Sequence, residues 1–94
     1  MKSKFAVAVA AVALLVSGAA QASAELADKA GCNKCHAADT KKMGPSYKDI
    51  AKKYKGNAAA EADLVKKLST GTGHPKATAS AADLTAITKW ILAM

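Results

Sequence analysis

After an apolar N-terminal run, the hydrophobic residues of the chain recur every three to four positions, as they do along amphipathic helices. No segment alternates strictly between apolar and polar residues, the pattern that predicts a half-buried strand. The most regular helical stretch has apolar side chains at positions i, i+3, i+4 and i+7, which are Tyr47, Ile50, Ala51 and Tyr54. We therefore expect a helix with one buried face here, and its other face carries four lysines.

Three more segments have helical periodicity, at about residues 24–33, at 58–69 and from 80 to the end of the chain. Their expected buried side chains are Leu26, Ala27 and Ala30, then Leu64, Val65 and Leu68, and finally Leu84, Ile87 and Ile91 with Trp90 beside them. The pattern predicts an all-α fold of about four short helices.

The predicted helices have recognisable boundaries. Ser46 and Ser80 each have an aspartate three residues later, a pattern that caps the start of a helix. Residues 37–43 are polar and lysine-rich, and residues 70–79 contain glycine and proline, so both segments predict loops. The chain has no internal repeat and no linker, which indicates one compact unit after the N-terminal run.

Residues 1–22 have the pattern of a secretory signal peptide that is removed after export. Lys2 and Lys4 precede the apolar run 5–16, and Ala20-Gln21-Ala22 is a small-residue cleavage site, with Ala22-Ser23-Ala24 as the alternative. The apolar run is shorter than the roughly 20 residues that a membrane-spanning helix needs. We therefore expect an exported protein, periplasmic in a bacterium, with no membrane anchor after cleavage.

Removal of this leader leaves residues 23–94 as a single domain of 72 residues, with 12 lysines, 7 acidic side chains and a formal net charge of +5. The chain has no arginine, which argues against nucleic-acid binding because recognition there favours a bidentate donor. A domain this short buries little apolar surface of its own. Its core therefore needs additional support, which a covalently bound group can supply.

The two cysteines of the chain occur in one motif, Cys32-Asn33-Lys34-Cys35-His36. Two cysteines separated by two residues and followed directly by histidine are the attachment signature of a c-type haem. Each thiol forms a thioether with one vinyl group of the porphyrin, and the histidine beside Cys35 binds the iron from one side. The motif predicts one covalent haem c held by Cys32 and Cys35, with His36 as an axial iron ligand.

Three other uses of this motif are possible. A Cys-x-x-Cys pair can be a thiol–disulfide oxidoreductase site without haem, although such sites occur in a βαβ context. It can also be half of a zinc site, but no second ligand pair stands at the right spacing. The third possibility is a structural disulfide. The adjacent His36 and the export signal favour haem over all three.

The mature chain resembles the small class I bacterial monohaem cytochromes c over essentially its whole length. The resemblance rests on Ala30 to His36, on Met43-Gly44-Pro45-Ser46-Tyr47 and on Lys89-Trp90-Ile91. It implies a cytochrome c fold, with four helices wrapped around the haem and with N- and C-terminal helices that cross at Gly31. It also implies that the Pro45 carbonyl accepts a hydrogen bond from His36, and that Tyr47 and Trp90 contact the haem.

The sequence departs from this family in the loop before the last helix. The family supplies its second axial ligand there from a methionine followed by proline, whereas this chain has His74-Pro75 and no methionine in the loop. Other candidates are Met43, Met94 and a water-filled or open position. Met43 follows His36 closely and Met94 ends the last helix, so we expect His74, whose imidazole commonly binds iron, to be the second ligand.

These features predict a periplasmic one-electron carrier, not an enzyme, with bis-histidine ligation and a lower reduction potential than a His/Met haem. The alternative is a ligand-binding or sensor protein whose sixth iron position is open or displaceable. We expect a monomer whose partners are redox proteins, with acidic docking surfaces as one way of binding them. Four lysines lie near the haem segments in sequence, namely Lys34, Lys41, Lys42 and Lys76. These lysines either steer acidic partners toward the haem or only make the surface more soluble.

Overall fold

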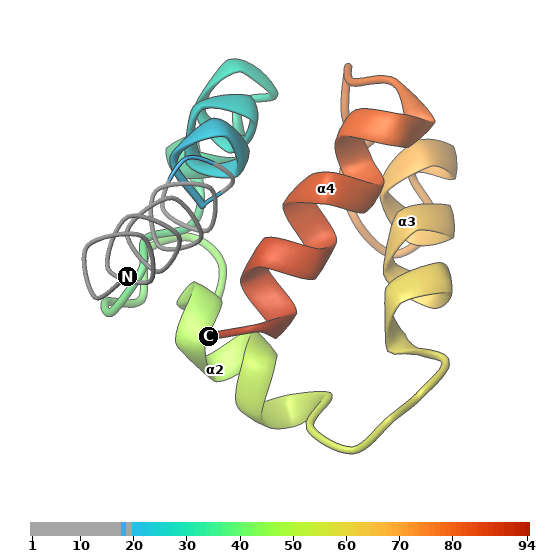
Figure 1. Cartoon of the computed structure of the whole chain (residues 1–94). Helices are drawn as coiled ribbons and strands as arrows, with labels where there is room; N and C mark the ends of the chain where they lie inside the picture. The colour runs from blue at the N-terminus through green and yellow to red at the C-terminus, as the bar shows by residue number, and fades with distance from the viewer. Residues whose placement is uncertain (1–17, 19) are drawn as a thin grey trace, which may run out of the picture.

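The computed structural model describes residue 18 and residues 20–94, so most of the predicted signal peptide lies outside the described residues. Residues 20–29 are helical and are followed by the short 3₁₀ helix η1, Cys32–Lys34. Three α-helices complete the chain in the order α2, Tyr47–Lys53, α3, Ala60–Thr70, and α4, Ala81–Leu92 (Figure 1). The described part of the chain contains no strand beyond an isolated bridge between His36 and Lys41, which confirms the all-α prediction.

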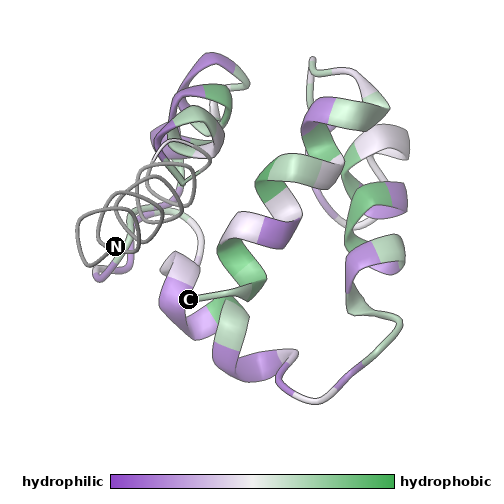
Figure 2. Ribbon diagram, viewed as in Figure 1, coloured by the Kyte–Doolittle hydropathy of each residue, from purple (hydrophilic) through white to green (hydrophobic). Residues whose placement is uncertain are grey.

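Helix α4 is the central element, and both α2 and α3 pack against it (Figure 1). It is also the most continuously hydrophobic helix, whereas α2 has mostly hydrophilic residues on its visible face (Figure 2). The buried core cluster joins α4 to the first helix and to α2, and consists of Ala27, Tyr47, Ile87 and Ile91. Leu84 of α4 is also fully buried. The predicted inner stripe of the last helix is therefore confirmed.

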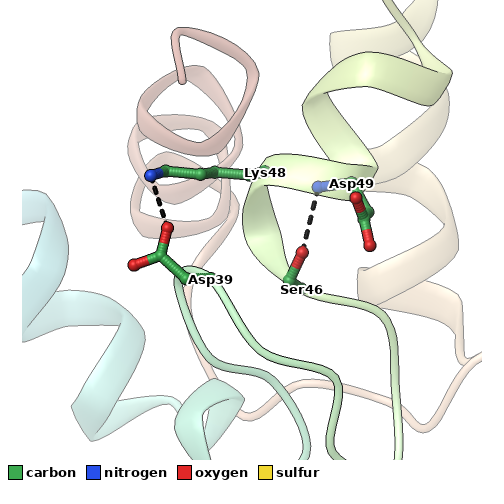
Figure 3. Close-up of polar contacts among 4 residues, drawn as sticks. All are labelled: Asp39, Ser46, Lys48 and Asp49. Carbon is green, nitrogen blue, oxygen red and sulfur yellow. Dashed lines mark hydrogen bonds and ion pairs between the residues drawn. The ribbon is translucent and has the colours of Figure 1, made fainter.

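Two serine caps fix where α2 and α4 begin. The Ser46 hydroxyl accepts a hydrogen bond from the Asp49 backbone N–H at 3.1 Å (Figure 3). Ser80 does the same for Asp83 at 3.2 Å. Each cap satisfies one of the backbone donors that a helix start leaves without an intrahelical partner. Both predicted capping positions are thus confirmed.

The end of the first helix and the role of Gly31 differ from the sequence predictions. The helix ends at residue 29 and not at 33, because Gly31 has a left-handed backbone with φ of 83°. A Cβ at Gly31 would have only the Lys34 side chain within 4 Å, so no α4 atom approaches it closely. The contact between the first helix and α4 is made at the buried Ala27 instead. Gly31 is needed for its backbone conformation, which most side chains disfavour.

The apolar edge of α3 is less buried than its sequence suggests. Leu64, Val65 and Leu68 are only half-buried, whereas Ala60 at the start of the helix is 2% exposed. Helix α3 packs against α4, which covers only one side of this edge. Among the residues that the structure describes, no helix is both long and apolar enough to cross a membrane.

Candidate functional site

The motif Cys32 to His36 forms a single tight turn. Its backbone bonds run from the Cys35 N–H to the Cys32 carbonyl at 3.2 Å and from the His36 N–H to the same carbonyl at 3.0 Å. Side chains three residues apart in a 3₁₀ turn lie on the same side, so Cys32 and Cys35 project together. Both thiols are half-buried and neither is in a disulfide. The turn therefore presents a pair of thiols to one side of the chain.

The chemistry of these thiols argues against a thiol-exchange site. Burial raises the pKa of the Cys32 thiol, an effect only partly offset by its backbone hydrogen bond. Reactive cysteines of oxidoreductases have a lowered pKa, because the thiolate is the nucleophile. Within the described residues, no group of three or more His, Cys, Asp or Glu side chains has the arrangement of a metal site, which disfavours the zinc alternative.

The His36 ring is oriented by a backbone acceptor. Its Nδ1 lies 2.6 Å from the Pro45 carbonyl oxygen. A carbonyl oxygen only accepts, so Nδ1 carries the proton and donates it. In a neutral imidazole the other nitrogen, Nε2, then keeps its lone pair. The contact implied by the family resemblance is thus present, and it leaves His36 with one nitrogen able to bind a metal.

Two further residues hold the His36 ring in place. A Cβ added at Gly44 would lie 2.9 Å from His36 Nδ1 and closer still to Cε1, so only glycine fits beside the ring. The Gly44 N–H donates to the Cys35 carbonyl at 2.8 Å, which ties this segment to the motif. Tyr47 at the start of α2 lies against the same ring, with centroids 5.7 Å apart and planes 27° apart. The imidazole is therefore fixed by groups from a separate segment.

Tyr47 connects the motif to the helical core. Its ring is 2% exposed and meets Trp90 of α4 edge to face, with centroids 5.5 Å apart. Its hydroxyl donates to Asn33 Oδ1 at 2.6 Å. Burial is the main reason that the pKa of Tyr47 rises to about 12, with smaller contributions from the negative charges of Cys32 and Asp28. The phenol is therefore neutral at physiological pH and acts as a hydrogen-bond donor.

Asn33 is a site residue that sequence reasoning missed. Its amide nitrogen donates to Asp28 Oδ1 at 3.3 Å, while its amide oxygen accepts from Tyr47. Its backbone carbonyl also accepts from Lys42 Nζ at 2.8 Å. Asn33 thus links the first helix, the loop and α2 to the motif. It occupies a spacer position of the Cys-x-x-Cys-His pattern, and because that pattern specifies no residue type there, it does not indicate this role.

His74 lies in the irregular segment between α3 and α4 and faces His36. The two imidazole planes are within 4° of parallel, and their centroids are 6.0 Å apart. Two imidazoles on opposite sides of one metal ion have centroids about 6 Å apart, because each metal–nitrogen bond is about 2 Å long. His74 Nδ1 is 2.7 Å from the Pro75 carbonyl oxygen, so its Nε2 is also left with its lone pair. The spacing suits a haem iron between the two rings.

The structure places the other ligand candidates differently. Met43 is 86% exposed and Met94 is 42% exposed, so neither is enclosed as a ligand of a buried metal would be.

Of the predicted docking lysines, Lys41 and Lys42 lie in the loop that follows His36. Lys41 forms a backbone bridge with His36, and Lys42 Nζ donates to the Asn33 carbonyl. Lys48, at the side of the same loop, forms an ion pair with Asp39 (Figure 3).

Comparisons with known proteins show which proteins the whole chain is similar to. A family model described as cytochrome c matches residues 20–94. Cytochrome c-551 of Allochromatium vinosum is 41% identical over 90 residues, covering 87% of this chain and 96% of that protein. Cytochrome c2 of Rubrivivax gelatinosus is 49% identical over 79 residues, covering 73% and 93%. The crystal structure of the class 1 cytochrome MtoD of Sideroxydans lithotrophicus ES-1 superposes with a TM-score of 0.67 at 34% identity, covering 78% and 92%.

Proposed function

The chain belongs to the cytochrome c family, and we propose that it is a periplasmic one-electron carrier whose haem iron has His36 and His74 as its two axial ligands. Proteins of this family bind one haem c covalently and act as electron carriers rather than enzymes. The single observation that carries the bis-histidine proposal is the pair of parallel imidazoles with centroids 6.0 Å apart. The attached haem supplies a reversible ferric–ferrous couple.

The residues of the chain hold and enclose this group. Cys32 and Cys35, on one side of a 3₁₀ turn, are the thioether positions. His36 is the ligand adjacent to them, and the Pro45 carbonyl keeps its Nδ1 protonated and its Nε2 free. Tyr47 and Trp90 form an aromatic pair beside this ligand and link it to the core of the protein. The contribution of the chain is therefore orientation and the exclusion of water.

A second histidine in place of methionine affects the reduction potential. Imidazole is a stronger donor than a thioether and lacks the preference of the thioether for ferrous iron, so bis-histidine ligation lowers the potential. The hydrogen bond to Pro45 acts in the same direction, since it raises the basicity of His36. We expect a potential below that of His/Met cytochromes. A redox titration that gave a potential as high as theirs would contradict this proposal.

The periplasmic location rests on the predicted signal peptide at residues 1–22. Covalent haem attachment in bacteria takes place outside the cytoplasm, which agrees with export. Replacing Lys2 and Lys4 by glutamate removes the positive charge that precedes the apolar run, and we expect this variant to remain in the cytoplasm without haem. Fractionation with haem staining checks this, and equal periplasmic haem protein from both chains would argue against the signal.

The lysines of the loop after His36 support a proposal about redox partners. Lys41 and Lys42 are exposed and joined to the haem motif, whereas Lys48 is paired with Asp39. A positive surface near the haem favours acidic partner surfaces and speeds the encounter at low salt. We expect Lys41→Glu to slow electron transfer to an acidic partner, and Lys66→Glu in α3 to serve as the charge-matched control. Equal ionic-strength dependence for both variants would favour a solubilising role.

The test of the ligand assignment is electron paramagnetic resonance of the ferric protein and of two variants in the same loop. We expect a low-spin bis-imidazole signal from the unchanged protein and a high-spin signal from His74→Ala. Lys76→Ala, a substitution of an exposed side chain two residues after His74, is the matched control and should retain the low-spin signal. A His/Met signal in the unchanged protein would overturn the assignment of His74 and leave the carrier role intact.

A further inference from the structure

The two histidines that face one another are anchored to different degrees. Every group that fixes the His36 ring comes from outside the Cys32–His36 motif: the Pro45 carbonyl, the bare Gly44 backbone and the Tyr47 ring. These groups are held in turn, because the Gly44 N–H bonds to the motif and Tyr47 starts a capped helix. The His36 ring can leave its position only if several independent contacts break.

His74 has a weaker attachment. The acceptor of its Nδ1 is the carbonyl of Pro75, the next residue, so this bond moves with the loop and does not hold the loop in place. The other ring contact given for His74 is the one to His36, with centroids 6.0 Å apart, near the long end of the range for aromatic pairs. In the haem protein, the position of His74 would therefore depend on iron binding and on its own loop, whereas His36 is held by several separate groups.

The backbone around His74 also permits movement. Gly71 and Gly73 have φ of 75° and 71°, and glycine passes between positive and negative φ at little cost. Two backbone hydrogen bonds join this loop to α3. One runs from the Gly71 N–H to the Lys67 carbonyl at 3.0 Å, and the other from the Ala77 N–H to the Leu68 carbonyl at 2.9 Å. The loop is thus tied at Gly71 and Ala77, with His74 between the two ties. A segment with few fixed contacts opens at low free-energy cost.

From this asymmetry we infer that the protein also binds small uncharged ligands of ferrous haem, such as carbon monoxide or nitric oxide, in the place of His74 while His36 remains bound. This inference rests on the proposed bis-histidine ligation. The ligand class follows from the surroundings: between residues 71 and 79 the ionisable side chains are His74 itself and Lys76, so the loop offers no acid that would donate a proton for bond-breaking chemistry. The site therefore binds a ligand without transforming it.

The size of the effect follows from the population of the open loop. Minor conformations of a folded protein are populated at about 0.1–10%, and apparent affinity falls by that fraction. Compared with the unchanged protein, His74→Ala should therefore bind carbon monoxide about 10- to 1,000-fold more tightly. The observed binding rate of His74→Ala should rise in proportion to the carbon monoxide concentration. The rate of the unchanged protein should reach a plateau at high concentration, set by the rate of loop opening.

The experiment is stopped-flow mixing of the reduced haem protein with carbon monoxide, followed by absorbance, for the unchanged chain, His74→Ala and the control Lys76→Ala. A plateau in the unchanged protein and the control, together with fast linear binding in His74→Ala, supports the inference. If the unchanged protein does not bind carbon monoxide while His74→Ala does, His74 is a permanent ligand, which overturns the inference and leaves the proposed ligation standing. If all three proteins bind equally fast without a plateau, the bis-histidine proposal itself is wrong.

Discussion

At the scale of single residues, the His36 ring occupies the space that a side chain at Gly44 would need. A Cβ there would lie 2.9 Å from His36 Nδ1, and the ring is also held by Pro45 and Tyr47. The glycine is thus explained by close packing and not by an unusual backbone angle. The consequence is that a single methyl group can disturb the imidazole proposed to bind the iron.

We expect Gly44→Ala to rotate or displace the His36 imidazole and to destabilise the haem protein by about 1–3 kcal/mol, the usual cost of overpacking. The paramagnetic resonance signal of the ferric protein should shift as the ring turns. Met43→Ala is the matched control, because the Met43 side chain is 86% exposed and precedes the glycine directly. Identical spectra and stabilities for both variants would show that the ring tolerates the methyl group.

Tyr47→Phe removes the phenol that donates to Asn33, and we expect a loss of about 0.5–1.5 kcal/mol near neutral pH. The effect depends on pH, because the folded pKa of about 12 lies above the unfolded value of about 10. The neutral phenol therefore contributes stability that is fully present below pH 10 and is lost as the pH rises toward 12. Denaturant unfolding of both proteins at several pH values should show the two stabilities converging in this range.

Thr88 is a buried polar residue with no role in the site. Its hydroxyl oxygen is buried and has no hydrogen-bond partner among the described residues, and Thr88 as a whole is 2% exposed. We expect Thr88→Val, which keeps the shape, to raise the free energy of unfolding by about 1 kcal/mol. Thr85→Val is the control, because the Thr85 hydroxyl donates to the Ala81 carbonyl at 2.9 Å. If Thr88→Val is no more stable than Thr85→Val, the Thr88 hydroxyl has a partner in solution.

At the scale of helices, the sequence predicted what depends on local rules. The helix-capping serines and the inner stripe of α4 follow from spacing alone, and both are confirmed. The predicted end of the first helix is wrong by four residues, because the left-handed backbone at Gly31 ends the helix before the cysteine motif. The apolar periodicity of the sequence continues past Gly31, and periodicity alone does not indicate that the φ angle changes sign there.

Helix α3 and Asn33 illustrate what local patterns cannot provide. The apolar edge of α3 predicted burial, but how far it is covered depends on a neighbouring helix that is remote in sequence. Asn33 stands between two cysteines, and its contacts to Asp28 and Tyr47 arise only after three segments fold together. The Pro45 contact came from the family resemblance, since no spacing rule places that carbonyl at the His36 ring.

At the scale of the whole molecule, the part of the chain that the structure describes has few fully buried side chains. The core cluster holds Ala27, Tyr47, Ile87 and Ile91, and Cys32 packs against it from the haem motif. A domain of this size is only marginally stable without an added group. Cys32, the proposed point of haem attachment, is therefore also in contact with the core.

We expect the double variant Cys32→Ala, Cys35→Ala, which cannot attach haem, to lose most of its helical circular dichroism at 25 °C. The reason is that the described core is too small to offset the chain entropy of folding. Met43→Ala, with its attachment sites intact, should retain the helical signal. A fully helical, cooperatively unfolding double variant would show that the polypeptide folds without its haem.

The contacts of His36 have a consequence for the order in which the protein is built. The Pro45 carbonyl is nine residues away in the chain, and the Tyr47–Asn33 bond spans 14 residues, so this half of the site closes short loops. His74 is 38 residues beyond His36 and must arrive across a much longer loop. Local contacts form earlier than distant ones. A chain that emerges N-terminus first can therefore complete the His36 side of the proposed haem pocket while His74, the other proposed ligand, is still unfolded.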